Sequence, residues 1–327
     1  MNSNFQINEF VEDRNSKKHL FTAGPASLLE ENILGLMPCF GRGDKEYLEI
    51  EEYVLQKIKS IAGQNKIVRL QGSATLAIEI MIKNFVTGKV LVIKGGAYSE
   101  RLVKFCRAQS KKISRLKIIN IKELEEENEC FDWIISCYTE TSIGYKFPID
   151  LLKEKANELG GKLMLDSTAS IGLEENHHLA DVQAFSSCKG LFGLTGGSFI
   201  CYNEEPVTFC DSYYLNLKTH INKEVTGPYH TICSLYYVLQ NHERLRVSVE
   251  KNKIKFMEKF KEYIVGGEDK NQPKLCTHVS CTVSAKEEGC ILYKARGSLK
   301  GSIVCHLGEV HLGDSAKGDI IDKLMET

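Results

Sequence analysis

Short apolar runs alternate with amphipathic stretches along the first two thirds of the chain. Between Leu48 and Ile61 the apolar positions recur near helical spacing among charged residues, which predicts an amphipathic helix. We expect further helices at 76–85 and about 99–108. The apolar runs predicted to form strands are KIVRL, KVLVI, DWIIS, LMLD and VQAFSS. Such alternation is typical of an α/β fold in which helices cover a mostly parallel central sheet.

The pattern changes after Tyr229. A long helical segment extends to Ile264, and short strand-like runs follow near HVSCTVS and GSIVCHL. We therefore predict three parts: an N-terminal arm (1–20), polar and without periodicity up to residue 18, a large domain (21–235) and a smaller C-terminal α+β domain (236–327). The charged stretches KELEEENE and KKISRLK are interpreted as solvated helical faces.

Composition narrows the function. The chain has 327 residues, of which 43% are hydrophobic, and a formal net charge of -1. This charge offers no field to attract nucleic acid or an anionic membrane, and no apolar run is long enough to cross a bilayer. Twelve scattered cysteines, together with the lack of an apolar signal segment, favour a cytoplasmic location. With no CxxC pair and no partners at zinc spacing for His177 and His178, we expect no metal site.

Two reactive side chains stand at the ends of consecutive predicted strands. Asp166 ends LMLD, and Lys189 follows VQAFSS. Because ligands of open α/β sheets bind beyond the carboxyl ends of the strands, both groups should reach one crevice. A lysine that forms a Schiff base and a carboxylate that keeps a pyridine nitrogen protonated are what pyridoxal 5'-phosphate requires. The alternative is that Asp166 caps a helix and Lys189 is a surface lysine.

The turn QGSAT lies between a predicted strand and a predicted helix. Free backbone N–H groups and the helix dipole favour a phosphate at such a turn, so Gly72, Ser73, Ala74 and Thr75 are the candidate phosphate cradle. The alternative is a simple helix N-cap by Ser73 or Thr75. Neither GxGxxG nor a Walker lysine motif is present, which argues against dinucleotides and nucleoside triphosphates.

Ordered motifs from about Phe21 to His242 carry a family resemblance. They are FTAGP, FGRGDKEY, LQGSATLAIE, GGAYSER, YTETSIG, LDSTASIG, SSCKG, SYYLNLK and TGPYHT. With them the chain resembles the class V branch of fold-type I pyridoxal phosphate enzymes, most closely the 2-aminoethylphosphonate:pyruvate and alanine:glyoxylate aminotransferases. The resemblance implies amino transfer from a small 2-aminoethylphosphonate-like donor to a keto acid such as pyruvate.

The resemblance also assigns site residues. Lys189 takes the Schiff base and proton-transfer role, and Asp166 contacts the pyridine nitrogen. Tyr98 stacks on the cofactor, with Leu102 as the alternative. The last assignments are Thr141 at the phenolic oxygen, Thr168 and Ser186 among the cofactor contacts, and Thr226 at the phosphate of a neighbouring subunit's cofactor, which implies a homodimer.

One departure from the family pattern concerns the substrate. Family members place an arginine for the substrate's anionic group in a small-domain strand, where this chain has Ile303 within SIVCHLGEV. Arg296, Arg42 and His306 are the candidates to replace it. The loss of that arginine leaves two alternatives open: a lyase or decarboxylase-type enzyme, or a degenerate cofactor-binding relative. Milder departures are Ala74 in the phosphate turn and Cys188 before the lysine.

Overall fold

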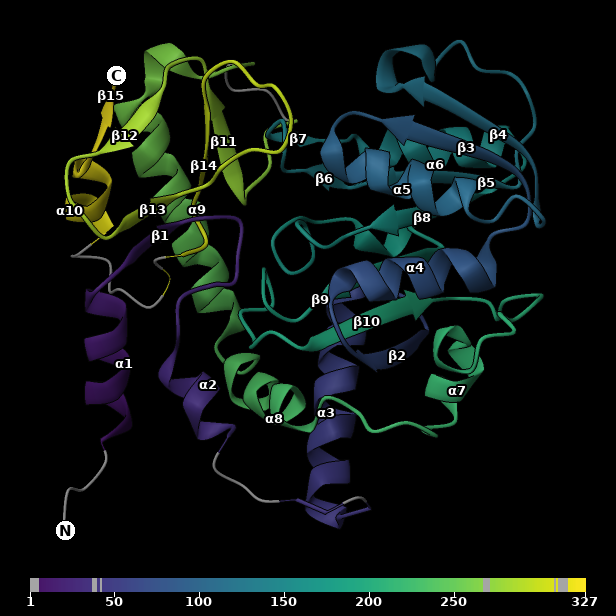
Figure 1. The fold of residues 1–327 in the computed structure, drawn as a ribbon, viewed down its shortest axis with the longest axis horizontal. Helices are drawn as coiled ribbons and strands as arrows, with labels where there is room; N and C mark the ends of the chain where they lie inside the picture. The colour runs from purple at the N-terminus through teal and green to yellow at the C-terminus, as the bar shows by residue number, and fades with distance from the viewer. Residues whose placement is uncertain (1–5, 37–39, 42, 267–270, 309, 311–316) are drawn as a thin grey trace.

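The computed structural model describes residues 6–36, 40–41, 43–266, 271–308, 310 and 317–327. Its centre is a seven-stranded sheet in the order β2-β10-β9-β8-β5-β3-β4 (Figure 1). All neighbours pair in parallel except β10, which is antiparallel to both β2 and β9. The strands are β2 (Lys66–Gln71), β3 (Gly88–Lys94), β4 (Ile113–Asn120), β5 (Trp133–Cys137), β8 (Lys162–Asp166), β9 (Val182–Ser186) and β10 (Gly197–Tyr202). The predicted α/β fold with a mostly parallel sheet is confirmed.

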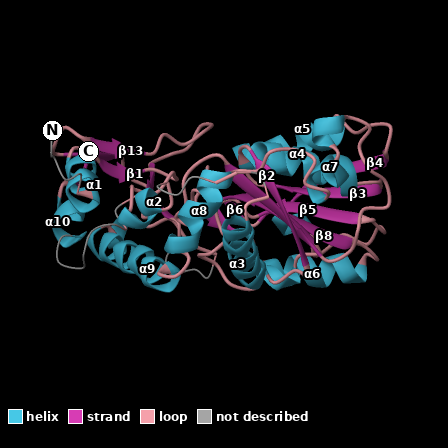
Figure 2. Ribbon diagram, turned by 90° about the horizontal axis from the view of Figure 1, so that it is seen from below, coloured by secondary structure: helices cyan, strands magenta, loops and turns pink. Residues whose placement is uncertain are grey.

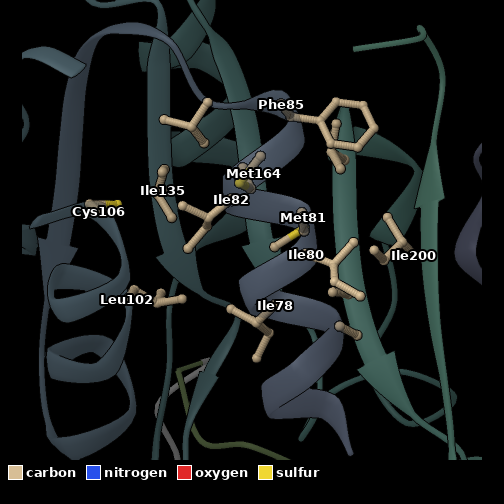
Figure 3. Close-up of a cluster of buried hydrophobic side chains, with 14 of the residues drawn as sticks. Ile78, Ile80, Met81, Ile82, Phe85, Leu102, Cys106, Ile135, Met164 and Ile200 are labelled. Carbon is tan, nitrogen blue, oxygen red and sulfur yellow. The ribbon is translucent and has the colours of Figure 1, made fainter. Parts of the chain in front are cut away.

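Helices cover both faces of this sheet. Figure 2 shows α4, α5 and α7 on one side and α3 and α6 on the other. Their bounds are α3 (Lys45–Ala62), α4 (Ala74–Phe85), α5 (Ala97–Arg107), α6 (Ile149–Glu158) and α7 (Leu217–Ile221). Figure 3 shows Ile78, Met81 and Ile82 of α4 against Ile135 and Ile200 of the sheet, all of them buried. Burying one such side chain contributes roughly 1.5–3 kcal/mol, so α4 is held mainly by this contact.

Most of the remaining elements form a second region around α9, whereas α8 packs against α2 and α3. Figure 1 shows short strands and α10 gathered beside this helix. β1 pairs in parallel with β13, so the N-terminal strand joins the C-terminal part of the chain. The pairs β11–β14 and β12–β15 are antiparallel. The elements are α1 (Ile7–Ser16), β1 (His19–Phe21), α2 (Glu30–Leu34), α8 (Tyr229–Val238), α9 (His242–Lys259), β11 (Cys276–Val279), β12 (Val283–Ala285), β13 (Cys290–Leu292), β14 (Ser302–Cys305), α10 (Lys317–Asp322) and β15 (Leu324–Glu326). The domain division proposed from the sequence remains a prediction, and β1 spans its first boundary.

Several local predictions are wrong. The N-terminal segment contains helix α1 despite its polar sequence, and the long helical segment is broken into α8 and α9 around Asn241. The run KKISRLK enters β4, an edge strand of the sheet, and KELEEENE contributes only a short 3-10 turn. Arg115 and Lys117 on β4 form ion pairs with Glu129 and Glu127 at 2.8 and 2.6 Å, so the basic and acidic stretches bind each other. Charges of this kind also protect a sheet edge from pairing with other chains.

Within the described ranges, no helix combines the length and the apolar character that a membrane span requires.

The turn that follows β5 forms a small hairpin of β6 (Thr139–Glu140) and β7 (Tyr145–Lys146). This hairpin lies close to the carboxyl ends of β5 and β8, because the main chain of Tyr138 donates a hydrogen bond to the carbonyl of Asp166 at 3.0 Å.

Candidate active site

A cavity of about 460 Å³ opens at the carboxyl ends of β8 and β9. Asp166 ends β8 and Lys189 follows β9, and both line this cavity. Every residue that the sequence assigns to the cofactor lines it as well, with the exception of Thr226. Further lining residues, which were not assigned to the cofactor from the sequence, are Arg101, Thr139, Ala169, Cys188, Thr195, Gly196 and Gly197.

Asp166 is a buried carboxylate, 4% exposed, with partners on both oxygens. Oδ1 accepts hydrogen bonds from the main-chain N–H and the hydroxyl of Thr168, at 3.0 and 2.5 Å. Oδ2 accepts one from the Arg101 guanidinium at 2.9 Å, and the same guanidinium donates to Thr75 Oγ1 at 2.9 Å. Arg101 thus compensates the charge of Asp166 and links it to the phosphate turn. The sequence could have indicated this role of Arg101. Arg101 follows Tyr98 by three residues in GGAYSER, and residues at this spacing lie on the same side of a helix.

Lys189 is positioned by the turn FTAGP. Gly24 in this turn has a φ of +126°, and a Cβ atom there would lie 3.0 Å from Lys189 Cγ and 3.7 Å from Cε. Only a glycine leaves room for the lysine stem in that conformation. The Lys189 ammonium lies 5.8 Å from the centroid of the Tyr98 ring.

Tyr98 is held at the start of α5 by the hairpin loop. The Glu140 carboxylate accepts hydrogen bonds from the N–H groups of Tyr98 and Ser99, at 3.2 and 2.8 Å, which caps the helix N-terminus. Three cations surround the Tyr98 ring: Arg101 Cζ at 5.3 Å, Arg296 Cζ at 5.5 Å and Lys189 Nζ at 5.8 Å. The alternative, Leu102, is fully buried in the core against the sheet.

The small C-terminal region contacts Tyr98, although neither Tyr293 nor Arg296 lines the cavity itself. The hydroxyl oxygens of Tyr98 and Tyr293 are 3.3 Å apart, and burial raises the pKa of Tyr293 well above its usual range. Tyr293 and Arg296 both follow β13. Sequence reasoning selected Arg296 but missed Tyr293, which resembles any other aromatic residue after a strand.

The turn QGSAT begins α4 as expected. Ser73 caps the helix, since its hydroxyl accepts a hydrogen bond from Leu76 N at 3.4 Å. Gly72 has a φ of +156°, and a Cβ there would lie 2.5 Å from Leu76 Cδ2. The N-cap and phosphate-cradle interpretations are therefore compatible, because the helix start itself faces the cavity.

Polar atoms in the cavity wall are available to a ligand. The hydroxyls of Thr139 and Thr141 are buried, line the cavity and have no hydrogen-bond partner in the described structure. Buried polar groups normally have partners, so two orphaned hydroxyls at one cavity indicate that a polar ligand belongs there. Together with Asp166, Lys189 and the helix start, they fit a compact ring that carries a phenolic oxygen and a phosphate.

The remaining predicted residues lie elsewhere. His306 is buried beside Phe256, with Nε2 2.9 Å from Thr277 Oγ1, and burial lowers its pKa to about 3. The structure does not bring this neutral ring into the cavity. Ile303 is 1% exposed and lies beside Gly144, where an added Cβ would be 3.0 Å from Ile303 Cδ1. Arg42 falls outside the described residues.

Thr226 lines a second hollow of about 620 Å³. This hollow shares Gly72, Thr195 and Gly196 with the cavity of Lys189, so the two meet at the phosphate turn. Within one chain Thr226 does not line the cavity of Lys189, although its hollow reaches the same turn.

Comparisons with known proteins give sequence relatives and structural neighbours of the chain. No protein-family model matches the chain. A 2-aminoethylphosphonate–pyruvate transaminase of Pseudomonas aeruginosa is 27% identical over 251 residues, which cover 68% of each chain. A bifunctional phosphonoacetaldehyde hydrolase/aminoethylphosphonate transaminase of Clostridioides difficile is 26% identical over 73% of this chain and 42% of its own.

Among solved structures, an alanine–glyoxylate aminotransferase from Nostoc superposes with a TM-score of 0.77 at 18% identity. The match covers 94% of this chain and 93% of that one, so the two share a fold from end to end. In sequence the chain is similar to 2-aminoethylphosphonate transaminases, and in structure it has the fold of the fold-type I aminotransferases.

Proposed function

We propose that this protein is a pyridoxal phosphate-dependent aminotransferase that moves an amino group from a small, 2-aminoethylphosphonate-like compound to a small keto acid such as pyruvate. The observation that carries the proposal is the meeting of Lys189, Asp166 and the helix-start turn at one cavity. The sequence relatives that bear transaminase names support the choice of reaction.

In this proposal, different residues of the cavity bind different parts of the cofactor. The turn at 72–75 would bind the phosphate through N–H groups at the start of α4, and Asp166 would pair with the pyridine nitrogen. Tyr98 offers its ring face, Thr141 offers an orphaned hydroxyl for the phenolic oxygen, and Thr168 and Ser186 complete the wall. When bound, the cofactor supplies the electron sink that allows a proton to leave the substrate carbon.

Lys189 carries the proton in this proposal. Its ammonium lies over the Tyr98 ring, and the absence of a side chain at Gly24 leaves room for its stem. An amine held in a dry pocket at the reacting carbon can act as a general base and then as a general acid. The carboxylate of Asp166, which is paired with Arg101, lines the same cavity.

Arg296 is our candidate for the substrate's anionic group. Arg101 is engaged by Asp166, and Ile303 is buried and apolar. Arg296 faces the same ring of Tyr98, is exposed, and has no carboxylate partner in the described part of the chain. A guanidinium with free donors suits a carboxylate or phosphonate, which it can bind in a bidentate manner.

We further propose a cytoplasmic homodimer. The hollow around Thr226 adjoins the phosphate turn, so Thr226 could serve the cofactor of a second copy. The described cysteines are all free, which suits a reducing compartment.

Replacing Lys189 tests the cofactor assignment. Lys189→Ala should abolish the visible absorption that survives desalting, because the covalent attachment of the cofactor depends on the lysine amine. Lys66→Ala, which breaks an exposed ion pair with Glu205, is the matched control and should keep the absorption. A Lys189→Ala protein that retained the covalently held cofactor would refute the assignment.

A further inference from the structure

A group of buried charges lies outside the cavity, between α3 and β2. Glu51 on α3 is 1% exposed, and its two carboxylate oxygens accept hydrogen bonds from Arg69 Nε and Lys223 Nζ. Tyr47, one helical turn before Glu51, donates its hydroxyl to Glu51 Oε1 at 3.1 Å. The Arg69 side chain on β2 is only 6% exposed, whereas that of Lys223 is half exposed. None of these four residues lines the Lys189 cavity.

Each partner of Glu51 also contacts the loop 223–229. Lys223 begins the loop with a φ of +54°, a conformation that costs free energy for a residue other than glycine. The Arg69 guanidinium lies against Gly227, where an added Cβ would be 2.4 Å from Arg69 Cζ. Tyr47 stacks on Tyr229 with ring centroids 4.2 Å apart and an angle of 23°. The loop is therefore held at its start, its middle and its end.

The loop forms one wall of the hollow described above. Thr226, Gly227 and Tyr229 line it opposite Gly72 and Gly196, which also belong to the Lys189 cavity. A displacement of the loop would move Thr226 relative to the phosphate turn.

Buried ion pairs are a poor source of net stability, because removing both charges from water costs about as much as their attraction returns. Breaking such a pair by removing one partner is nevertheless strongly unfavourable, since a charge is left buried and uncompensated. A cluster of this kind is thus better suited to fixing one conformation of a loop than to strengthening the fold.

We propose that Glu51, Arg69 and Tyr47 form a positioning cluster that fixes the loop 223–229 and so sets the place of Thr226 beside the phosphate turn. This inference rests on the proposed role of Thr226 in cofactor binding. Glu51 touches no reacting group, and its effect on the cofactor passes through the loop.

A double-mutant cycle on the full-length protein tests the coupling. The dissociation constant of pyridoxal phosphate is measured for the wild type, Glu51→Gln, Thr226→Val and the double variant. We expect each single change to weaken binding by on the order of tenfold, and the double variant to be no weaker than either single one. Glu205→Gln, which breaks the exposed pair with Lys66, is the control and should leave the constant unchanged.

Hydrogen exchange of the loop amides, measured without cofactor, separates this inference from the proposed function. Glu51→Gln should raise exchange at 223–229 and leave α4 unchanged. If Glu51→Gln does not fold, Lys223→Met removes the half-exposed partner and is measured instead. The positioning role would be overturned if Glu51→Gln left the exchange of the loop amides unchanged. It would also be overturned if the losses of cofactor affinity in the two single variants added up in the double variant. A wild type that bound no cofactor would overturn the proposed function, while the exchange data would still decide whether the cluster orders the loop.

Discussion

At the scale of single residues, the site depends on which charged side chains pair with one another. The sequence was sufficient to predict that Asp166 and Lys189 meet, because both follow strands of one parallel sheet. It was not sufficient to predict the partner of Asp166. Arg101 lies 65 positions away, and only the packing of α5 beside the end of β8 brings its guanidinium to the carboxylate.

Arg101 should therefore matter to stability more than a surface arginine does. Arg101→Gln leaves the buried carboxylate of Asp166 without its guanidinium, and we expect the free energy of unfolding to fall by about 3 kcal/mol in urea denaturation. Arg115→Gln breaks the exposed pair with Glu129 and should cost at most about 1 kcal/mol. Equal losses in the two variants would show that the Arg101–Asp166 pair contributes nothing beyond a surface ion pair.

Arg296 is predicted to act on substrate binding. Arg296→Gln should raise the KM for an anionic amino donor by on the order of 10–100-fold, as expected when a charged hydrogen bond to the substrate is lost, with a smaller change in kcat. Lys294→Gln, an exposed cation two residues earlier, is the control and should leave KM unchanged. If Arg296→Gln keeps the wild-type KM, the anion is bound by another group.

At the scale of elements, hydrophobic spacing located α3, α4 and the strands β2, β3, β5, β8 and β9 to within a few residues, but β10 was not predicted. It could not tell that β10 runs antiparallel, because GSFICY is buried on both faces in the same way as its parallel neighbours. Nor could spacing show that Glu140 caps α5, since the carboxylate arrives from a separate hairpin. β4 was not predicted as a strand because Arg115 and Lys117 interrupt the apolar pattern of its sequence.

The short 3-10 helix at His177–Leu179 should make the fold sensitive to acid. The His177 ring is buried, with Nδ1 2.9 Å from Gln183 Oε1, and burial lowers its pKa to about 4. The unfolded chain, with a histidine pKa near 6.5, binds the proton first as the pH falls. Stability is therefore lost between about pH 6.5 and pH 4, by roughly 3 kcal/mol at 1.36 kcal/mol per pKa unit.

The free energy of unfolding, measured at pH 7 and pH 4.5, checks this. The difference between the two values should be smaller for His177→Gln than for the wild type by about 2 kcal/mol. His178→Gln changes an exposed neighbour and should keep the wild-type difference. If His177→Gln also keeps the wild-type difference between the two pH values, the buried ring does not titrate as proposed.

At the scale of the whole molecule, the active site is assembled from distant parts of the chain. The N-terminal turn with Gly24, the sheet ends and the loop after β13 all meet at Lys189 and Tyr98. The ordered motifs from FTAGP to TGPYHT indicated which of these segments contribute to the site. The periodicity of the chain could not reveal that β1 pairs with β13, or that Thr226 would lie in a separate hollow, since both depend on contacts between distant segments.

The central claim is transamination by this assembled site. It is tested most directly by the visible absorption spectrum of the purified protein during titration with 2-aminoethylphosphonate in the absence of keto acid. We predict that the band of the lysine-bound cofactor falls while the band of its amino form rises, and that pyruvate then restores the original spectrum. A cofactor band that stays unchanged at every concentration of the amine would contradict the proposed donor and reaction.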